Sequence, residues 1–451
     1  MDDKYTMPAP DEIERLIAEG RLAELHDLLA TIHPADIAVL LDELSADEAV
    51  IVFEMLSLEV ASEVLDETGS LVRQELVEKV DDERLADLLD TLPMDDAAEF
   101  LEDLPDPVSE RLIGLMEPEE AADVQEILAY EEETAGRIMT TDIAMLRRHW
   151  TVAETLDYLR SLEDAETIHY LYVVDRTDKL IGVVPLRELI MALPNATIES
   201  LMKEQVVAVS ATADQEELAE MMSRYDYFAM PVVDTAGRLL GVVTVDDILD
   251  VFEEEVTEDI QRLGGSEPLD QPYFAASITQ IVRKRIGWLM LLFVASTLSG
   301  EVIRFFQNEL DTIVALGFFI TLITGTGGNA GSQTVATIIR AITLDEVKMG
   351  NMWQAWRREV LVGFMLGLAM GAVGIVRALL WHTGFDVALV VALTLPVVVI
   401  WSTTIATIIP IVADRVHIDP TVISGPMITT IVDASGLLIY FSLAKLLIAV
   451  I

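Results

Sequence analysis

The chain has 451 residues, 52% of them hydrophobic, and its mean hydropathy of +0.41 is too high for an ordinary soluble protein. It also carries 77 acidic against 29 basic residues, and a net charge of −48 excludes a simple membrane bundle. The charge is confined to residues 1–270, with 67 acids and 18 bases, whereas residues 271–451 hold 10 acids and 11 bases. The sequence therefore predicts an acidic aqueous half, then an apolar half, and about three domains.

Composition also removes several classes of function. An acidic half of this kind repels phosphate backbones, which argues against nucleic-acid binding. The chain has no cysteine, so disulfides, thiolate metal sites and cysteine nucleophiles are excluded. The start, Met1-Asp-Asp-Lys4, lacks a basic segment followed by an apolar one. We therefore expect no cleaved signal peptide and an acidic half that stays in the cytoplasm.

Residues 33–128 repeat every 12 positions. The eighth position of each block is apolar, and the twelfth almost always is, which places both on one face of a short helix. The blocks begin with residues typical of helix starts and breaks: His33, Ser45, Ser57, Gly69, Asp81, Pro93, Pro105 and Glu117. Short helices of this kind stack into a solenoid, whose usual role is contact. We assign residues 10–132 to an all-α solenoid domain.

A second repeat, of α/β type, occupies residues 137–256. The segment Leu180-Ile-Gly-Val-Val184 corresponds to Leu239-Leu-Gly-Val-Val243, and each copy predicts strand, helix, apolar strand, turn, strand and helix. This order resembles a tandem pair of CBS domains, which we place at residues 137–199 and 200–256.

CBS pairs often bind adenine nucleotides through an S/T-x-x-D motif. The second copy has Thr244-Val-Asp-Asp247, whereas the first has Pro185-Leu-Arg-Glu188 and departs from the pattern. The resemblance implies ATP or another adenine nucleotide as a ligand of the pair. Its contacts would be Tyr170, Arg187, Glu188 and Tyr227.

An acidic helix leads from the CBS pair toward the apolar half. An apolar stripe runs through Phe252, Val256 and Ile260, while Glu255, Glu258 and Asp259 share another face. Like charges at this spacing repel by roughly 0.2–0.5 kcal/mol per pair. The ordinary interpretation is a solvated face. The alternative is a face whose carboxylates are neutralised by divalent cations. We assign residues 250–270 to this linker helix.

The apolar half contains stretches that each meet the roughly 20 residues of a spanning helix. They run over residues 286–306, 312–342, 360–381, 387–412 and 421–451. Five crossings place eight basic residues on the side of the acidic half and three on the other. The positive-inside rule then predicts a multi-pass protein of the inner (cytoplasmic) membrane, with the C-terminus on the opposite side. A break in the 31-residue second stretch would change the count.

The second stretch contains a glycine-rich polar segment, Gly325-Thr-Gly-Gly-Asn-Ala-Gly-Ser-Gln333. Close packing of helices through small residues would explain the glycines. A locally opened helix whose carbonyls line a wet cavity would also explain the polar residues Asn329, Ser332 and Gln333. We expect the opened helix.

The fifth stretch places a carboxylate, Asp433, about 18 Å from its start at Thr421, near the middle of the membrane. A charge there costs at least ~2.5–3.5 kcal/mol, so it should face water, a cation or a base. No Lys or Arg lies deep in another span, and Thr429 and Thr430 lie close by. The pattern indicates a path for cations.

The solenoid, the CBS pair, the acidic helix, the five spans and the motifs Gly325–Gln333 and Ser424–Gly436 together resemble the MgtE family of magnesium channels. The resemblance implies a homodimer in the lipid bilayer, with a pore between protomers lined by the second and fifth spans. Asp433 would hold hydrated Mg²⁺, and the linker helix would act as a plug. The pore domain would occupy residues 283–451, and its site residues would be Asp433, Thr429, Thr430, Asn329 and Gly328.

The same resemblance implies that divalent cations also regulate the channel. Ions held between carboxylates of the solenoid, the CBS pair and the plug would favour a compact, closed state when cytoplasmic Mg²⁺ is high. The matching positions are Glu63, Asp95, Glu99, Asp214, Glu216, Asp226, Asp247, Asp250, Glu255, Glu258 and Asp259.

Other functions fit the sequence less well. A CBS-regulated anion channel shares the architecture, but its pore should offer cationic groups in place of Asp433. An enzyme would need a catalytic set, and the six scattered histidines form no H-x-x-x-H pattern. Co²⁺ or Mn²⁺ could replace Mg²⁺, since they accept the same ligands. A halophilic origin, suggested by 7 Lys against 22 Arg, would explain the acidity without competing with transport.

Overall fold

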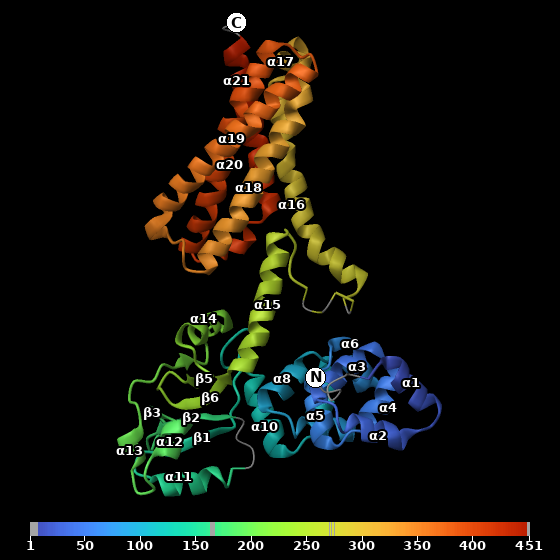
Figure 1. The fold of residues 1–451 in the computed structure, drawn as a ribbon, viewed down its shortest axis with the longest axis vertical. Helices are drawn as coiled ribbons and strands as arrows, with labels where there is room; N and C mark the ends of the chain where they lie inside the picture. Colours follow the sequence, from blue (N-terminus) through green and yellow to red (C-terminus); the bar gives the residue numbers. More distant parts are fainter. Residues whose placement is uncertain (1–7, 163–166, 270, 272, 275, 449–451) are drawn as a thin grey trace, which may run out of the picture. The chain divides into compact units, whose positions relative to one another are not determined.

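The structure is a computed structural model that describes residues 8–162, 167–269, 271, 273–274 and 276–448. It falls into two compact units, residues 1–255 and 256–451. The division lies within one helix, α15 (Val245–Leu263), which contributes its first part to unit 1 and its end to unit 2. Figure 1 shows the order of the elements along the chain.

Unit 1 begins with a run of short helices, drawn from blue to teal in Figure 1. They are α1 (Pro10–Ala18), α2 (Leu22–Leu29), α3 (Pro34–Glu43), α4 (Ala46–Glu54), α5 (Leu58–Asp66), α6 (Ser70–Lys79), α7 (Asp82–Leu89), α8 (Met94–Glu102), α9 (Asp106–Ile113) and α10 (Pro118–Ile127). Each predicted block start is the N-cap of one of the helices from α3 to α10. At α4 the Ser45 amide donates to the Glu48 carboxylate at 3.2 Å, half of a capping box. The predicted helical repeat is confirmed.

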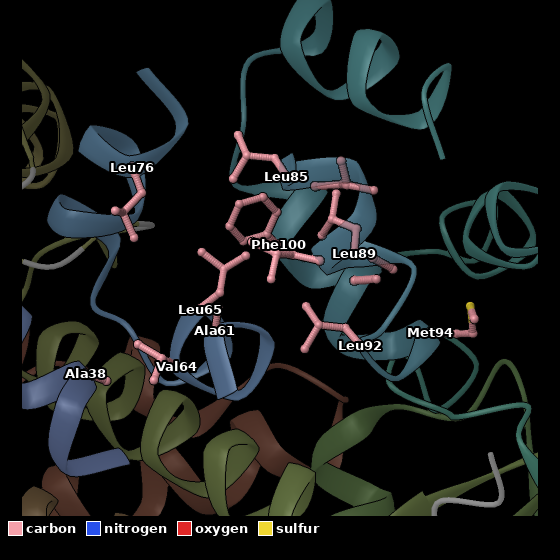
Figure 2. Close-up of a cluster of buried hydrophobic side chains, with 14 of the residues drawn as sticks. Ala38, Ala61, Val64, Leu65, Leu76, Leu85, Leu89, Leu92, Met94 and Phe100 are labelled. Carbon is pink, nitrogen blue, oxygen red and sulfur yellow. The ribbon is translucent and has the colours of Figure 1, made fainter. Parts of the chain in front are cut away.

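The repeat builds the core of these helices. The eighth position of every block is at most 2% exposed: Leu40, Val52, Val64, Leu76, Leu88, Phe100, Leu112 and Val124. Figure 2 shows Phe100 of α8 among Leu65 of α5 and Leu85 and Leu89 of α7, two helices that precede it in the chain. Burying one such side chain contributes about 1.5–3 kcal/mol. Because alternate helices pack (α3 on α5, α5 on α7, α7 on α9), one helix per repeat suffices for a continuous core.

Two small sheets complete unit 1. The first sheet holds β1 (Ile143–Arg147), β2 (Thr167–Val174) and β3 (Leu180–Pro185), with α11 (Val152–Leu159) and α12 (Leu186–Met191). The second holds β4 (Val209–Ser210), β5 (Ala229–Val233) and β6 (Leu239–Thr244), with α13 (Ile198–Leu201), α14 (Gln215–Tyr225) and the start of α15. In each sheet the first pair of strands is parallel and the second antiparallel, so the two predicted copies are confirmed.

The repeated glycines let the two copies interlock. Thr140, which precedes the first sheet, pairs with Val242 of the second, and Lys203 pairs with Val183 of the first. A Cβ at Gly241 would lie 2.4 Å from the carbonyl oxygen of Thr140. The crossing backbone therefore explains why β6 has a glycine at this position.

Unit 2 contains five helices, among the described residues, that are long and apolar enough to cross a membrane. They are α16 (Ile278–Phe305), α18 (Ile320–Thr343), α19 (Met352–Leu380), α20 (Phe385–Arg415) and α21 (Gly425–Ile448). Short elements join them: α17 (Gln307–Thr312) and the 3-10 helices η1 (Val314–Phe319), η2 (Met349–Asn351) and η3 (Pro420–Val422). The predicted second stretch changes from a 3-10 helix to an α-helix between η1 and α18, but it remains one candidate span. The predicted end of the fifth stretch, residues 449–451, lies outside the described residues.

The two ends of this bundle are called here the near face and the far face. At the near face α16, α19 and α21 begin and α18 and α20 end; the far face is the opposite end. α16 and α19 each start eight residues before the predicted apolar stretch, because the helix continues through polar and basic residues beyond it.

The prediction of an opened helix at Gly325–Gln333 is wrong. The segment is a continuous part of α18, and three of its four glycines lie against neighbouring helices, Gly325 being the exception. A Cβ at Gly327 would lie 2.8 Å from Val398 of α20, and one at Gly331 would lie 2.7 Å from Ile428 of α21. Close approach supplies the packing, so the backbone has no need to open. The Ser402 hydroxyl of α20 also donates to the Gly327 carbonyl at 2.6 Å.

Candidate functional site

Asp433 lies eight residues inside α21, about 12 Å from the helix start, and its side chain is partly exposed. Among the residues that the structure describes, no base forms an ion pair with it and no donor bonds to it. Pairing with a base on another helix is therefore not the reason for this carboxylate. An intramembrane carboxylate without a protein partner needs water or a cation.

Hydroxyl groups of α18 and α21 meet one turn before Asp433. The Thr429 and Ser332 hydroxyls share a hydrogen bond of 3.1 Å. Both oxygens also lie within hydrogen-bond distance of the Gly425 carbonyl, at 3.0 Å from Thr429 and 3.3 Å from Ser332, so one hydroxyl donates to the carbonyl while the other donates to its neighbour. Thr430 instead donates to the Pro426 carbonyl within its own helix, at 2.9 Å. Ser332 was visible only as a polar residue of the glycine-rich segment, because sequence spacing cannot show a contact across 97 residues.

The other two predicted pore residues divide into one buried and one exposed. Gly328 faces Thr429, since a Cβ added to it would lie 2.7 Å from the Thr429 methyl group. The next residue, Asn329, is exposed on the surface of unit 2. Thr429 precedes Asp433 by four residues, so its contact with Ser332 brings hydroxyl groups of α18 and α21 one helical turn from this carboxylate. Such groups suit a hydrated hard cation.

The end of α15 packs onto the near face of unit 2. Leu263 contacts a cluster that includes Val335 of α18 and Ile428 of α21. Gly265 follows at φ +77°, where a Cβ would lie 2.7 Å from the Trp288 indole nitrogen. That indole donates to the Ser424 hydroxyl at 3.2 Å, just before α21. The linker therefore ends against the first residues of the helix that carries Asp433.

Arg262, which no sequence motif indicated, stabilises the contact between the end of α15 and the start of α21. The Arg262 guanidinium forms ion pairs with Glu258 in the same helix and with Asp419, 2.6 Å away. Asp419 also accepts bonds from the Thr421 amide and hydroxyl, at 2.8 and 2.6 Å, and so caps η3. Glu258, a predicted metal ligand, already has a cationic partner here.

Carboxylates of unit 1 meet where α8 faces the start of α15. Carboxylate oxygens of Asp95, Asp96 and Asp247 lie within 4.8 Å of one another, and Asp95 is only 6% exposed. The Asp247 carboxylate accepts bonds from the Thr244 amide and hydroxyl at 2.9 and 2.6 Å, which orients it. Loss of hydration raises the pKa of Asp247. Three hard oxygen donors at this spacing can hold a divalent cation.

A second acidic region lies on the same side of α15. Loss of hydration and the charges of neighbouring carboxylates raise the pKa of Asp66 to about 6 and that of Glu254 to about 7. Glu99 contributes to both shifts, and Arg73 forms ion pairs with Glu99 at 4.0 Å and with Asp103 at 3.3 Å. Asp66, Glu99 and Glu254 still reach solvent, so screening reduces the free energy that these shifts represent. One guanidinium is too little charge to balance this region.

The remaining predicted regulatory residues are more dispersed. Glu63 is exposed on α5, and Glu216 is exposed in the first turn of α14. Asp214 caps α14 by accepting from the Glu216 amide at 2.9 Å, and Asp226 ends that helix at φ +54°. Glu255 and Asp250 lie on α15. The Glu255 carboxylate accepts a hydrogen bond from the Gln215 amide at 3.1 Å. Loss of hydration and nearby carboxylates raise the pKa of Asp250. Asp259 is partly buried near the end of α15. The structure brings Asp95 and Asp247 together, but among the described residues none of these other carboxylates joins a set of three oxygens.

The predicted nucleotide contacts fall into two groups. The rings of Tyr170 and Tyr227 lie edge to face, 6.1 Å apart, although one comes from each CBS copy. Arg187 is exposed, and Glu188 forms an ion pair with Lys203 at 3.1 Å. Asp247 of the S/T-x-x-D motif is engaged by Thr244 beside Asp95. The aromatic pair is placed to stack on a base. Asp247, the acidic end of the motif, instead contacts Thr244 and the carboxylates of α8.

Profiles of known protein families match both the acidic half of the chain and most of its apolar half. The divalent cation transporter profile, MgtE, matches residues 320–443, and the MgtE intracellular N domain matches residues 32–133. The CBS domain profile matches residues 135–195 and 198–254. The matched segments follow the order predicted from the sequence.

Curated relatives match the chain over almost their full length. The magnesium transporter MgtE of Thermus thermophilus is 35% identical over 446 residues, which cover 96% of this chain and 97% of the relative. That of Bacillus subtilis is 32% identical over 445 residues, 95% of each chain. A solved structure of the cytosolic domain of the Mg²⁺ channel MgtE in complex with ATP is 39% identical. It superposes with a TM-score of 0.52, covering 54% of this chain and all of that one.

Proposed function

The chain belongs to the MgtE family of divalent cation transporters, and on this premise we propose that it conducts Mg²⁺ across the cytoplasmic membrane. It is a multi-pass membrane protein with a soluble N-terminal part, from a family of transporters and not of enzymes. The observation that carries the choice of ion is Asp433, a carboxylate without a described protein partner, beside a hydroxyl-lined contact of α18 and α21.

The chemistry of Mg²⁺ fits this carboxylate. Mg²⁺ releases its water reluctantly and prefers one or two carboxylates plus several waters over an all-protein cage. A homodimer with its two-fold axis along the pore presents two Asp433 side chains to one hydrated ion. Thr429 and Asn329 then offer oxygens to the water shell. Co²⁺ and Mn²⁺ are the competing substrates, since they accept the same ligands.

The same proposal covers gating and topology. The near face, with most of the basic residues, lies in the cytoplasm together with unit 1, and the C-terminus lies on the other side. Cytoplasmic Mg²⁺ binds Asp95, Asp96 and Asp247 and relieves repulsion in the acidic region around Glu254. Because α15 continues from this region to Leu263, the compact state of unit 1 favours the closed pore. Several weak sites acting together make a steep switch.

A nucleotide is the second ligand that we propose. The family relative whose cytosolic domain was solved with ATP supports an adenine nucleotide at the CBS pair. In this chain the base lies by Tyr170 and Tyr227, and Arg187 meets the phosphates. The Pro185-to-Glu188 segment, which replaces the S/T-x-x-D pattern, weakens the ribose contact in the first copy.

Flux into liposomes tests the transport function. We expect the reconstituted full chain to admit Mg²⁺, with competition by Co²⁺, and to admit no chloride. Asp433→Asn, which removes the charge at nearly constant volume, should lower Mg²⁺ flux at least tenfold or abolish selectivity over Ca²⁺. Asp414→Asn, at an exposed carboxylate of the near face, is the matched control and should behave as wild type. Chloride flux, or wild-type flux and selectivity from Asp433→Asn, would refute the proposal.

A further inference from the structure

Six arginines at the near face of unit 2 have no acidic partner in the part of the chain that the structure describes. They are exposed and, among the described residues, none forms an ion pair. We call them the near-face arginines: Arg283, Arg285, Arg340, Arg357, Arg358 and Arg415. In a chain with 77 acidic residues, so many unpaired guanidiniums in one place require an explanation.

Bases elsewhere in the chain behave differently. At the far face Arg304 pairs with Glu301, Lys445 pairs with Glu309, and the Arg377 guanidinium lies 4.2 Å from the centre of the Trp381 ring. Most bases of unit 1 also pair with a carboxylate, as in the contact of Arg147 with Asp178. The acidic composition therefore does not by itself leave bases unpaired, and at the near face Lys348 pairs with Asp345, 2.6 Å away, while the near-face arginines do not pair among the described residues.

Exposed aromatic residues accompany these charges at two helix starts. Trp353, which precedes Arg357 and Arg358, is 62% exposed. Its ring stacks on that of Trp356, with 4.4 Å between the ring centres. The buried indole nitrogen of Trp356 has no hydrogen-bond partner among the described residues. Before α16, Phe274 is 86% exposed and Tyr273 lies edge to face with it. Tryptophan and tyrosine prefer the headgroup level of a bilayer, where an apolar ring meets polar groups.

We propose that the near-face arginines bind the phosphates of anionic phospholipids. Guanidinium groups recognise phosphate oxygens through two parallel hydrogen bonds, and each base near an anionic surface adds about fivefold in affinity. The aromatic residues at the starts of α16 and α19 set the depth of the headgroups. The ligand is a lipid of the leaflet at the near face, and its binding does not depend on which ion crosses the pore.

The surroundings favour a lipid over the other acidic partners that this chain could meet. An acidic protein surface would leave Phe274 and Trp353 in water, whereas a bilayer interface buries their apolar rings. A second copy in two-fold contact at this face would bring arginine against arginine. Free phosphate offers the same oxygens without an acyl chain beside the rings.

The test uses the full chain in mild detergent with EDTA. We expect dioleoyl phosphatidylglycerol to raise the thermal unfolding midpoint, while dioleoyl phosphatidylcholine and glycerol 3-phosphate at equal concentration do not. In Arg357→Gln/Arg358→Gln, the phosphatidylglycerol concentration for a half-maximal shift should rise about 30-fold, since two charges are lost. Salt at 0.5 M should also raise the phosphatidylglycerol concentration that the wild-type protein needs for a half-maximal shift, because salt screens the charges.

A matched control removes two charges that are already paired. Arg304→Gln/Lys445→Gln should keep the wild-type response to phosphatidylglycerol. If the Arg357/Arg358 variant does not fold, Arg283→Gln/Arg285→Gln tests the same surface from α16. Equal stabilisation by phosphatidylcholine, stabilisation by glycerol 3-phosphate, or an unchanged half-maximal concentration in the near-face variants would overturn the proposal.

Discussion

At the scale of single residues, the contact between α18 and α21 depends on the absence of one side chain. A methyl group at Gly328 would lie 2.7 Å from Thr429, closer than packed carbon atoms come. We expect Gly328→Ala to cost about 1–3 kcal/mol through overpacking. The thermal midpoint should fall by several degrees, and Mg²⁺ flux should fall with it because Thr429 is displaced.

Gly300 of α16 provides the control for this prediction. It is also a helical glycine, but nothing lies within 4 Å of a Cβ built on it. Gly300→Ala should leave the midpoint unchanged or slightly raised, since alanine is the better helix former. Equal midpoints for the two variants would show that the glycine contact is not tightly packed in the membrane.

At the scale of elements, one cation ties the end of α15 to the turn before α21, beside the apolar contacts of Leu263. Arg262 joins Glu258 to Asp419, and Asp419 in turn caps the turn before α21. Because these groups are about one-third exposed, the link contributes on the order of 1 kcal/mol. Arg262→Gln should therefore raise the Mg²⁺ concentration that half-inhibits flux by roughly fivefold.

The ion pair of Arg238 with Asp234 on the CBS surface is the control for Arg262. Its 2.7 Å contact resembles that of Arg262, but it lies within unit 1. Arg238→Gln should leave inhibition by Mg²⁺ unchanged. An unshifted midpoint in Arg262→Gln would mean that the end of α15 does not need this link to close the pore.

At the scale of the whole molecule, the acidic region of unit 1 should respond to protons as well as to metal. The pKa of Asp66 is raised to about 6 and that of Glu254 to about 7, above the unfolded values of 3.8 and 4.5. The folded state therefore binds more protons than the unfolded state between these pKa values. The stability that protonation of the two carboxylates contributes is complete below about pH 4 and is lost as pH rises through 6–7. In EDTA, resistance of unit 1 to protease should fall between pH 5 and pH 8.

Millimolar Mg²⁺ should restore that resistance at pH 8, because it neutralises the same carboxylates. Matched ionic strength from KCl is the control. Equal protection by KCl would indicate simple screening, as in a halophilic protein, and would contradict specific Mg²⁺ sites. Protease resistance independent of pH in EDTA would contradict the role assigned to the region around Glu254.

Much of the fold follows from patterns that the sequence states locally. The 12-residue period fixes which face of each short helix is apolar, and burial of positions such as Phe100 follows from that alone. The five apolar stretches fix the crossings, and the Gly-Val-Val repeats fix the paired sheets. Asp433 stood out because a charge in an apolar run is costly wherever the run packs.

The sequence by itself determined the order of the elements, the division of charge and the presence of a carboxylate in the membrane. Tertiary structure decided which groups meet: Asp96 joins Asp95 and Asp247, and Arg262 reaches Asp419 across 157 residues. It also decided that the glycine-rich segment of α18 stays helical, since neighbouring helices fill the space beside its backbone. Periodicity reports the face of one element, whereas a site depends on the packing of several, which no local pattern encodes.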